Sequence, residues 1–320
     1  MDTPLREELL LGDNLDALPR FPEGSFALVY ADPPFNTGKR QVRRTLETQA
    51  DANGDRRGFG GRRYRTRVLA ESSYRDRFDD YLGFLEPRLR EIRRVLAESG
   101  TLYLHLDYRE AHAVKLLCDE LFGRESFLNE IVWAYDYGAR TRRRWPAKHD
   151  TILVYVKDPE RYWFDSEEVD REPYMAPGLV GPEKAARGKL PTDVWWHTIV
   201  SPTGREKTGY PTQKPEGLVR RMVQASTRPG EICLDPFAGS GTLGAAARAL
   251  GRGFVLVDES PDALDVAGRR LGLAPAVVRR SARLAERSMT HVEPPSGLPA
   301  PVGGISPGSS ADGTRTERAL

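Results

Sequence analysis

Short continuous apolar runs alternate along the chain with longer segments whose apolar residues recur at helical spacing. The run SFALVYA at 25–31 is typical of a strand buried on both faces. The segment at 109–123 has apolar residues at helical spacing and ends at Gly123, a residue typical of helix ends. The same pattern predicts further strands at 101–107, 151–156, 231–235 and 253–258, and helices at 81–100, 109–123, from Pro215, at 242–250 and from Pro261. Such alternation predicts an α/β fold with a mostly parallel sheet and helices on both faces.

Three segments interrupt this alternation. Residues 36–80 are rich in Arg and Gly and poor in aliphatic residues, so we expect a basic mobile loop there. Residues 134–210 mix strand-like runs with RTRRRWPAKH and DVWWHT, and we expect a separate smaller region. From 273 to 320 the chain turns to Pro, Ser, Gly and Arg without periodicity, which predicts a disordered tail.

Composition narrows the classes of protein. A chain of 320 residues with 39% hydrophobic content can bury a large core, whereas 48 Lys and Arg against 46 Asp and Glu leave a net charge of only +2. Any affinity for nucleic acid must therefore come from local clusters. Cys118 and Cys233 are too far apart in the sequence to suggest a disulfide framework or a zinc site, so we expect no metal. Without a membrane-length apolar run, we expect a cytoplasmic protein.

A glycine-rich turn follows the strand at 231–235. The strand leads through Asp235 and Phe237 into Gly239-Ser240-Gly241, a helix begins at Thr242, and Asp258 ends the next strand. Glycine permits close approach of a ligand, the helix N-terminus favours anions, and an acid at Asp258 suits ribose hydroxyls. Taken alone, the glycine-rich turn could equally be structural and bind no ligand. The combination favours a nucleoside cofactor, and the spacing differs from that of dinucleotide sites.

Two motifs together resemble one enzyme family. DPFAGSGT resembles the S-adenosylmethionine loop of amino-methylating DNA methyltransferases, and Asp32-Pro33-Pro34-Phe35 resembles their Asp-Pro-Pro-Tyr/Phe motif. Here the catalytic motif precedes the cofactor motif, which is the circularly permuted order of the β class. Similar stretches lie at 12–18, 100–107, 129–135, 148–158 and 209–219. The resemblance implies a Rossmann-like methyltransferase domain at 1–272, with target recognition within 134–210.

The chemistry of the first motif suits an exocyclic amine, whose lone pair is delocalised into the base. The Asp32 carboxylate and the Pro33 carbonyl can accept the two N–H groups, so that the lone pair localises toward the methyl donor. Pro34 fixes the backbone, and Phe35 offers a stacking face to a base flipped out of the duplex. A proline turn that merely caps the strand is the structural alternative. Phe35 stands where Tyr is commoner in the family.

The resemblance also implies binding residues. Asp13 and Asn14 would meet the adenine ring of the cofactor, and Thr212, Gln213 and Lys214 would point at its methionine end. The other expected cofactor contacts are Asp235, Phe237, Gly239, Ser240, Gly241, Thr242 and Asp258. The expected DNA contacts are Lys39, Arg40, Arg142, Arg143, Arg144 and Lys148, because cations beside aromatic residues suit phosphates and bases. For any single arginine, a solvated surface position is the alternative.

The predicted function is a site-specific DNA methyltransferase that uses S-adenosylmethionine and acts on N6 of adenine, with N4 of cytosine as the alternative. A cytosine-C5 enzyme is excluded because neither cysteine follows a proline. A protein-glutamine methylase would carry Asn-Pro-Pro-Tyr and the opposite motif order. An inactive DNA-binding relative would show damaged motifs. Double-stranded DNA is the expected partner, a homodimer and a cognate restriction endonuclease are further candidates, and association with a bacterial nucleoid is expected.

Overall fold

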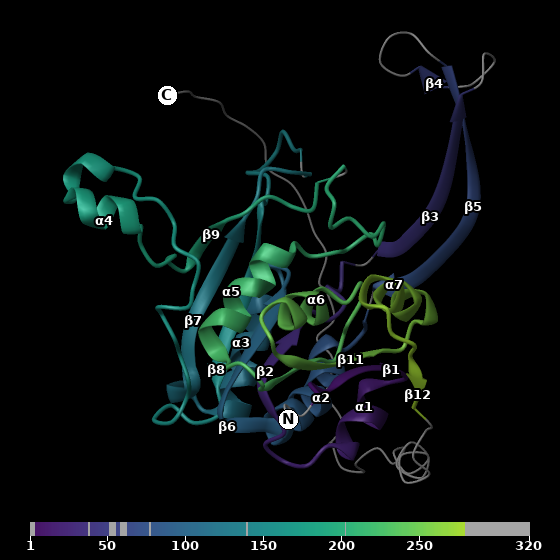
Figure 1. Ribbon diagram of the computed structural model, residues 1–320. Helices are drawn as coiled ribbons and strands as arrows, with labels where there is room; N and C mark the ends of the chain where they lie inside the picture. Colours follow the sequence, from purple (N-terminus) through teal and green to yellow (C-terminus); the bar gives the residue numbers. More distant parts are fainter. Residues whose placement is uncertain are drawn as a thin grey trace, which may run out of the picture. The chain divides into compact units, whose positions relative to one another are not determined.

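The computed structural model describes residues 4–278, except 38, 51–55, 58–62, 77, 139 and 202. Nine strands form one sheet in the order β12-β1-β11-β10-β2-β6-β8-β7-β9 (Figure 1). Their bounds are β1 Glu7–Leu11, β2 Phe26–Ala31, β6 Leu96–Leu106, β7 Phe127–Ala134, β8 His149–Val156, β9 Val194–Trp196, β10 Ile232–Asp235, β11 Gly253–Asp258 and β12 Ala276–Val277. The strands from β12 to β6 are parallel, and β8 is antiparallel to both of its neighbours. The predicted α/β class is confirmed.

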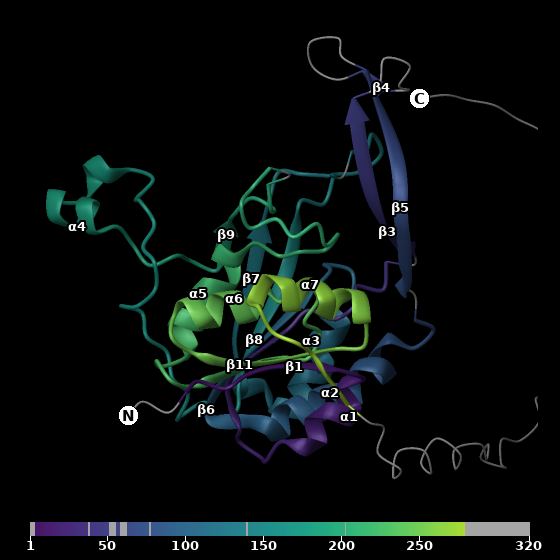
Figure 2. The same ribbon diagram turned by 45° about the vertical axis from the view of Figure 1, so that its right-hand side comes forward.

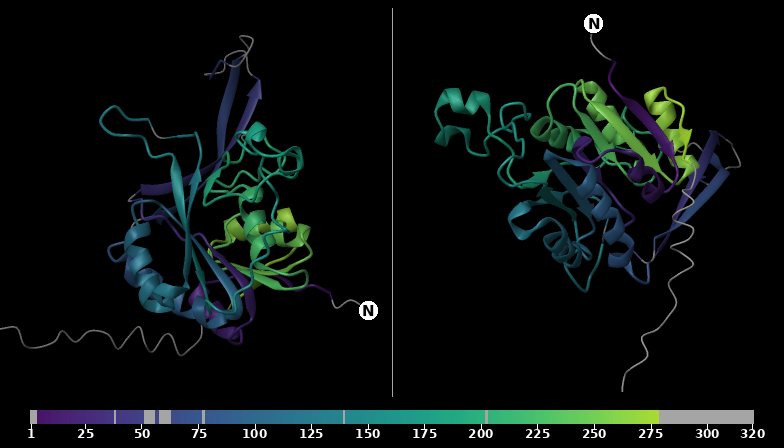
Figure 3. Two further views of the ribbon diagram at one scale, coloured as in Figure 1. Left: turned by 90° about the vertical axis from the view of Figure 1, so that its left-hand side faces the viewer. Right: turned by 90° about the horizontal axis from the view of Figure 1, so that it is seen from below.

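Helices cover both faces of this sheet (Figure 3). One layer holds α1 Asn14–Ala17, α2 Tyr81–Val95 and α3 Ala111–Phe122, and the other holds α5 Glu216–Ser226, α6 Thr242–Ala249 and α7 Pro261–Leu271. Short helices are η1 Leu18–Arg20, η3 Arg124–Ser126, η4 Pro177–Leu179 and α4 Pro182–Arg187. Alternate residues of β2 enter the two cores, Val29 and Ala31 on the α2 side and Leu28 and Tyr30 on the α5 side. A central parallel strand therefore reads as one apolar run.

The helix predicted at 81–100 ends earlier, at Val95. Asp80 caps its start by accepting a hydrogen bond from the Gly83 N–H at 2.8 Å. Leu96 is fully buried and pairs with Phe26, so β6 begins immediately after the helix. The local sequence pattern predicts a helix as far as Gly100. In the structure the residues from Leu96 onward pair with β2 instead, so the helix ends at Val95.

The expected loop at 36–80 contains paired strands. β3 Lys39–Ala50 runs antiparallel to β5 Arg63–Asp76, and β4 Arg56–Arg57 pairs with β5, forming a three-stranded sheet of their own (Figure 2). These ranges form strands, so the prediction of a loop is wrong for them, and the expected mobility stays a prediction. Paired strands bond alternate backbone groups to each other without needing an aliphatic core, so the shortage of aliphatic residues did not exclude strands here.

Two further boundaries differ from the prediction. β8 and β9 belong to the main sheet, so residues 134–210 do not form a separate region. The predicted tail also begins too early, because β12 pairs with β1 and Val278 is buried. Residues 279–320, on which the rest of the tail prediction falls, lie outside the described residues.

Among the described residues, no helix has the length and apolar character needed to cross a bilayer. The same part of the chain brings no three His, Cys, Asp or Glu side chains together in a way that could hold a metal ion.

Candidate active site

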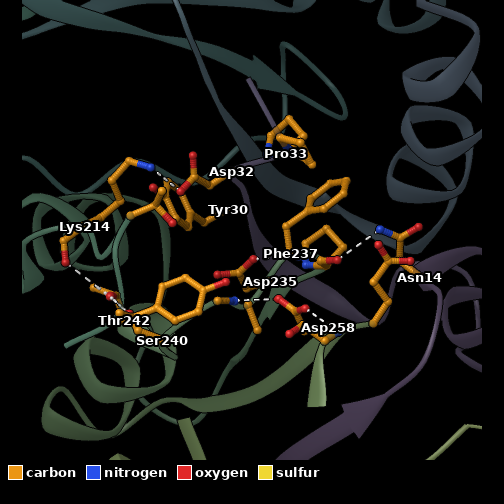
Figure 4. A pocket seen from close by; sticks show the side chains of 18 of the residues that line it. Asn14, Tyr30, Asp32, Pro33, Lys214, Asp235, Phe237, Ser240, Thr242 and Asp258 are labelled. Carbon is orange, nitrogen blue, oxygen red and sulfur yellow. Dashed lines mark hydrogen bonds and ion pairs between the residues drawn. The ribbon is translucent and has the colours of Figure 1, made fainter. Parts of the chain in front are cut away.

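The two motifs meet at the carboxyl edge of the sheet. β2 and β10 are parallel neighbours, with Leu28 opposite Cys233 and Val29 opposite Leu234. Their carboxyl ends therefore lie side by side, and each continues into one of the two motifs. A cavity of about 640 Å³ opens at this edge, where open α/β sheets bind ligands (Figure 4).

Most of the predicted catalytic and cofactor residues line this one cavity. They are Asp13, Asn14, Asp32, Pro33, Pro34, Phe35, Thr212, Lys214, Asp235, Phe237, Gly239, Ser240, Thr242 and Asp258. They come from segments as far apart in sequence as residues 13 and 258. The chain thus gathers both motifs around a single space.

Gln213 and Gly241 are not among the lining residues. The Gln213 side chain accepts from the Thr208 N–H at 2.8 Å and donates to the Glu206 carbonyl at 2.7 Å. Gly241 begins α6 with φ +73°, and a Cβ placed there would lie 2.9 Å from the Cβ of Ala267. In this structure Gln213 therefore shapes its own loop, and Gly241 lets α6 pack closely on α7.

Asp258 organises the glycine-rich turn. Its two carboxylate oxygens accept from the N–H groups of Gly239 and Ser260, each at 2.8 Å. Burial raises the pKa of Asp258, and these two hydrogen bonds oppose that rise. A carboxylate oxygen has two acceptor positions, so each oxygen retains capacity for a ligand hydroxyl. The geometry is compatible with the predicted ribose contact.

Lys214 makes an ion pair with Asp32, the first residue of the catalytic motif. The ammonium contacts Oδ2 of Asp32, and the two side chains are only 10% and 16% exposed. The same ammonium lies 4.8 Å from the centre of the Phe35 ring. The Thr242 hydroxyl donates to the Lys214 carbonyl at 3.2 Å, which ties this segment to the start of α6. The pair joins the catalytic motif to the segment before α5.

The floor of the cavity is acidic. Asp235 is 2% exposed and accepts from the Phe237 N–H at 2.9 Å. Burial raises the pKa of Asp235 well above its usual value, and the charges of Asp32 and Asp258 add to the rise. A cationic group of a ligand placed here would offset this repulsion and stabilise the ionised form of Asp235.

Asn14 has an acceptor ready for a ligand. Its side-chain N–H donates to the Pro236 carbonyl at 3.0 Å, whereas Oδ1 is buried and has no hydrogen-bond partner among the described residues. A buried acceptor without a partner is costly. An exocyclic amine of a purine at this end of the cavity would satisfy it, as the predicted adenine contact requires.

Sequence reasoning missed several lining residues, among them Tyr30, Phe84, Arg88, Tyr210 and Glu259. Arg88 contacts both carboxylate oxygens of Asp13 at 3.3 Å and lies 3.9 Å from the centre of the Phe84 ring. Asp13 also caps α1 through the Leu15 N–H. No motif marks Arg88, and the only signal was its position one turn after Phe84 in α2.

The predicted DNA contacts fall in two places. The side chains of Lys39 and Arg40 lie outside the described residues. Arg142, Arg143 and Arg144 are exposed in the loop between β7 and β8, and Lys148 pairs with Asp136 at 3.0 Å. This loop leads into the start of β8, and the start of β8 pairs with the carboxyl end of β6. The loop therefore lies at the carboxyl edge of the sheet. Trp145, which sequence reasoning did not single out, is 95% exposed in the same loop.

The comparisons with known proteins agree with this arrangement. The model of a family described as DNA methylase matches residues 26–269, and the chain belongs to that family. DNA adenine methyltransferase YhdJ of Escherichia coli (strain K12) is 31% identical over 304 residues, covering 89% of this chain and 93% of YhdJ. Type II methyltransferase M.HpaI of Haemophilus parainfluenzae is 29% identical, covering 83% and 74%. The crystal structure of the M1.HpyAVI–SAM complex has a TM-score of 0.53 at 19% identity, covering 83% and 99%.

Proposed function

We propose that this protein transfers a methyl group from S-adenosylmethionine to the N6 amine of adenine in double-stranded DNA. The observation that carries the proposal is the opening of the Asp32-Pro33-Pro34-Phe35 segment into the cavity that the glycine-rich turn and Asp258 also line. Membership of the DNA methylase family and similarity to YhdJ, which is named an adenine methyltransferase, support it. We assign target recognition to the part at 134–210, within a catalytic domain that extends through β12.

The residues present fit the proposed cofactor. The free acceptor of Asn14 suits the adenine amine, Asp258 suits the ribose hydroxyls, and the acidic floor at Asp235 suits a sulfonium cation. Phe237 lines the same cavity and offers an apolar surface. When bound, S-adenosylmethionine supplies the electrophilic methyl group.

The residues of the catalytic motif act on the base. Lys214 contacts Oδ2 of Asp32, so we assign Oδ1 to one N–H of the target amine and the Pro33 carbonyl to the other. Held in this way, the nitrogen lone pair would be available to the methyl group that the cofactor supplies, and the N–C bond would form as the bond from the methyl carbon to sulfur breaks. The extra proton on nitrogen then passes to the Asp32 carboxylate and on to water. The Phe35 face holds the flipped base by stacking.

The DNA would be held by the exposed loop at 135–148. Arg142, Arg143 and Arg144 suit phosphates, and the exposed Trp145 ring suits an unstacked base. Lys39, Arg40 and Lys148 remain proposed contacts. Similarity to a Type II methyltransferase supports a restriction–modification setting, with a cognate endonuclease as a further partner. We also propose a homodimer and association with the bacterial nucleoid.

Identification of the modified base tests the proposal. Unmethylated bacterial genomic DNA is incubated with the protein and labelled S-adenosylmethionine, digested to nucleosides and analysed by mass spectrometry. We expect N6-methyladenine. N4-methylcytosine would instead establish the alternative base, and the absence of any methylated nucleoside with folded protein would overturn the methyltransferase assignment.

Variants locate the reaction at the motif. Asp32→Ala should abolish transfer while cofactor binding, measured by calorimetry, is largely retained. Asp265→Ala is the matched control, because Asp265 is an exposed carboxylate on α7 outside the cavity. The double variant Asp32→Asn/Lys214→Met removes both charges of the ion pair and should also be inactive. Wild-type turnover in a folded Asp32 variant would refute the catalytic assignment.

A further inference from the structure

A buried polar chain lies directly behind the catalytic motif. Tyr30 lies on β2, two residues before Asp32. The Tyr30 hydroxyl lies 2.9 Å from Nδ1 of His105 on β6. His105 has no exposed surface, and its Nε2 lies 3.3 Å from Oδ2 of Asp150 on β8. The Tyr135 hydroxyl donates to the other Asp150 oxygen at 3.0 Å. Four polar side chains, from β2, β6, β8 and the residue that follows β7, thus form one continuous chain.

The chemistry of each group fixes the direction of the hydrogen bonds. Asp150 can only accept when it is ionised, so His105 donates from Nε2 and accepts at Nδ1 from the Tyr30 hydroxyl. Burial and the charge of Asp32 raise the pKa of Tyr30, so its hydroxyl stays protonated and can donate. Burial raises the pKa of Asp150, but the hydrogen bonds from His105 and Tyr135, together with the charge of Lys214, lower it overall. The chain is therefore fully satisfied with Asp150 ionised.

The same imidazole supports the catalytic motif from behind. The ring centres of His105 and Phe35 are 5.7 Å apart, and those of His105 and Trp133 are 5.5 Å apart with nearly perpendicular planes. Tyr30 and Phe35 line the cavity, whereas His105 and Asp150 do not. His105 therefore contacts the residue assigned to stack the base and bonds the residue two positions before the assigned acceptor.

We infer that His105 is a positioning residue for the target base, held in one orientation by Asp150 and acting through the Phe35 ring and Tyr30. Burying a polar chain of this kind is costly unless every member is paired, and a paired chain allows few alternative rotamers. An apolar residue at 105 could fill the volume but could not hold Tyr30 by a hydrogen bond. This inference rests on the proposed methyl transfer at Asp32.

Two buried tyrosines, Tyr30 and Tyr103, allow an effect on positioning of the base to be distinguished from an effect on folding stability. Tyr30 and Tyr103 are 2% and 3% exposed, and each hydroxyl bonds a single buried side chain, that of Tyr103 meeting Ser226 at 2.8 Å. Tyr103 does not line the catalytic cavity. Tyr30→Phe and Tyr103→Phe should therefore lose similar stability in urea unfolding. Only Tyr30→Phe should lower kcat on unmethylated genomic DNA, on the order of 10-fold, as misplacement of reacting groups does.

The conservative replacement at His105 gives a second readout. His105→Gln keeps a polar group that can reach its partners, and His105→Leu keeps only volume. We expect kcat to fall on the order of 10- to 100-fold in His105→Leu. Part of this activity should return in His105→Gln, with cofactor affinity unchanged by calorimetry in both.

A double-mutant cycle with Phe35 tests the route of the effect. If His105 acts through the Phe35 ring, His105→Leu should cost much less activity in a Phe35→Ala background than in the wild type. Fully additive losses, or equal activity losses in Tyr30→Phe and Tyr103→Phe, would overturn the inference while leaving an active wild type and the proposed function intact. A folded wild type that methylates no DNA would overturn the proposed function instead.

Discussion

The ion pair between Lys214 and Asp32 should be worth several kcal/mol when only one partner is removed. The side chains are 10% and 16% exposed, so a lone charge left at either position would be largely desolvated. Breaking such a buried pair costs about 3–5 kcal/mol, whereas an exposed pair contributes about 0–1 kcal/mol. Lys214→Met and Asp32→Asn should therefore each lower the free energy of unfolding by about 3 kcal/mol.

The assay is urea unfolding followed by circular dichroism, with the double variant completing a cycle. Lys214→Met/Asp32→Asn leaves no unpaired charge, so its loss should be smaller than that of either single variant. Arg90→Met is the control, because Arg90 and Glu86 form an exposed pair at 2.7 Å with side chains 59% and 43% exposed. It should change the free energy of unfolding by less than about 1 kcal/mol. Single losses at Lys214 and Asp32 no larger than the Arg90→Met loss, or a double loss equal to their sum, would refute the reasoning.

Three further outcomes follow from the geometry. Gly241→Ala should destabilise the protein by about 1–3 kcal/mol more than Gly251→Ala in thermal or urea unfolding. Both glycines have φ +73°, but only Gly241 has a neighbour, Ala267, within 4 Å of the added Cβ; equal losses would contradict the packing argument. Because burial raises the pKa of Asp235 above its usual 3.8, the stability that this group contributes is present at low pH and lost as pH rises through its folded-state pKa. Asp235→Asn should therefore become progressively more stable than wild type as pH rises from about 4, and a pH-independent difference in urea unfolding would count against this. The last outcome concerns Arg142, Arg143 and Arg144. Neutralising these three arginines together should flatten the slope of log DNA affinity against log salt by about 2–3 units. An unchanged slope would mean that they contact no phosphate.

The cavity could be predicted in outline from local sequence. Each of its two motifs follows an apolar run that reads as a strand, and strand ends in parallel sheets share an edge. The order of the motifs and the glycine-rich turn were enough to name the family. Gln213 and Gly241 belong to the binding motifs without lining the cavity, because a motif names residue types without saying which side chains turn into the cavity and which hold the loop.

Contacts between distant residues could not be predicted in this way. Lys214 and Asp32 are 182 positions apart, and Arg88 and Asp13 are 75 apart. Neither pairing leaves a local pattern, because each depends on which elements become neighbours. The chain from Tyr30 through His105 to Asp150 is similar, since the run TLYLHLD reads only as a strand.

The sequence by itself determined the fold class, the strand and helix alternation, the two motifs and hence the chemistry of the cavity. These features depend on periodicity and on residues close together in the chain. Only the tertiary structure decided where α2 ends, that β3 pairs with β5, and that β8 joins the main sheet. In each case strand pairing between distant segments outweighed local preference, because backbone groups must find partners wherever the folded chain brings them.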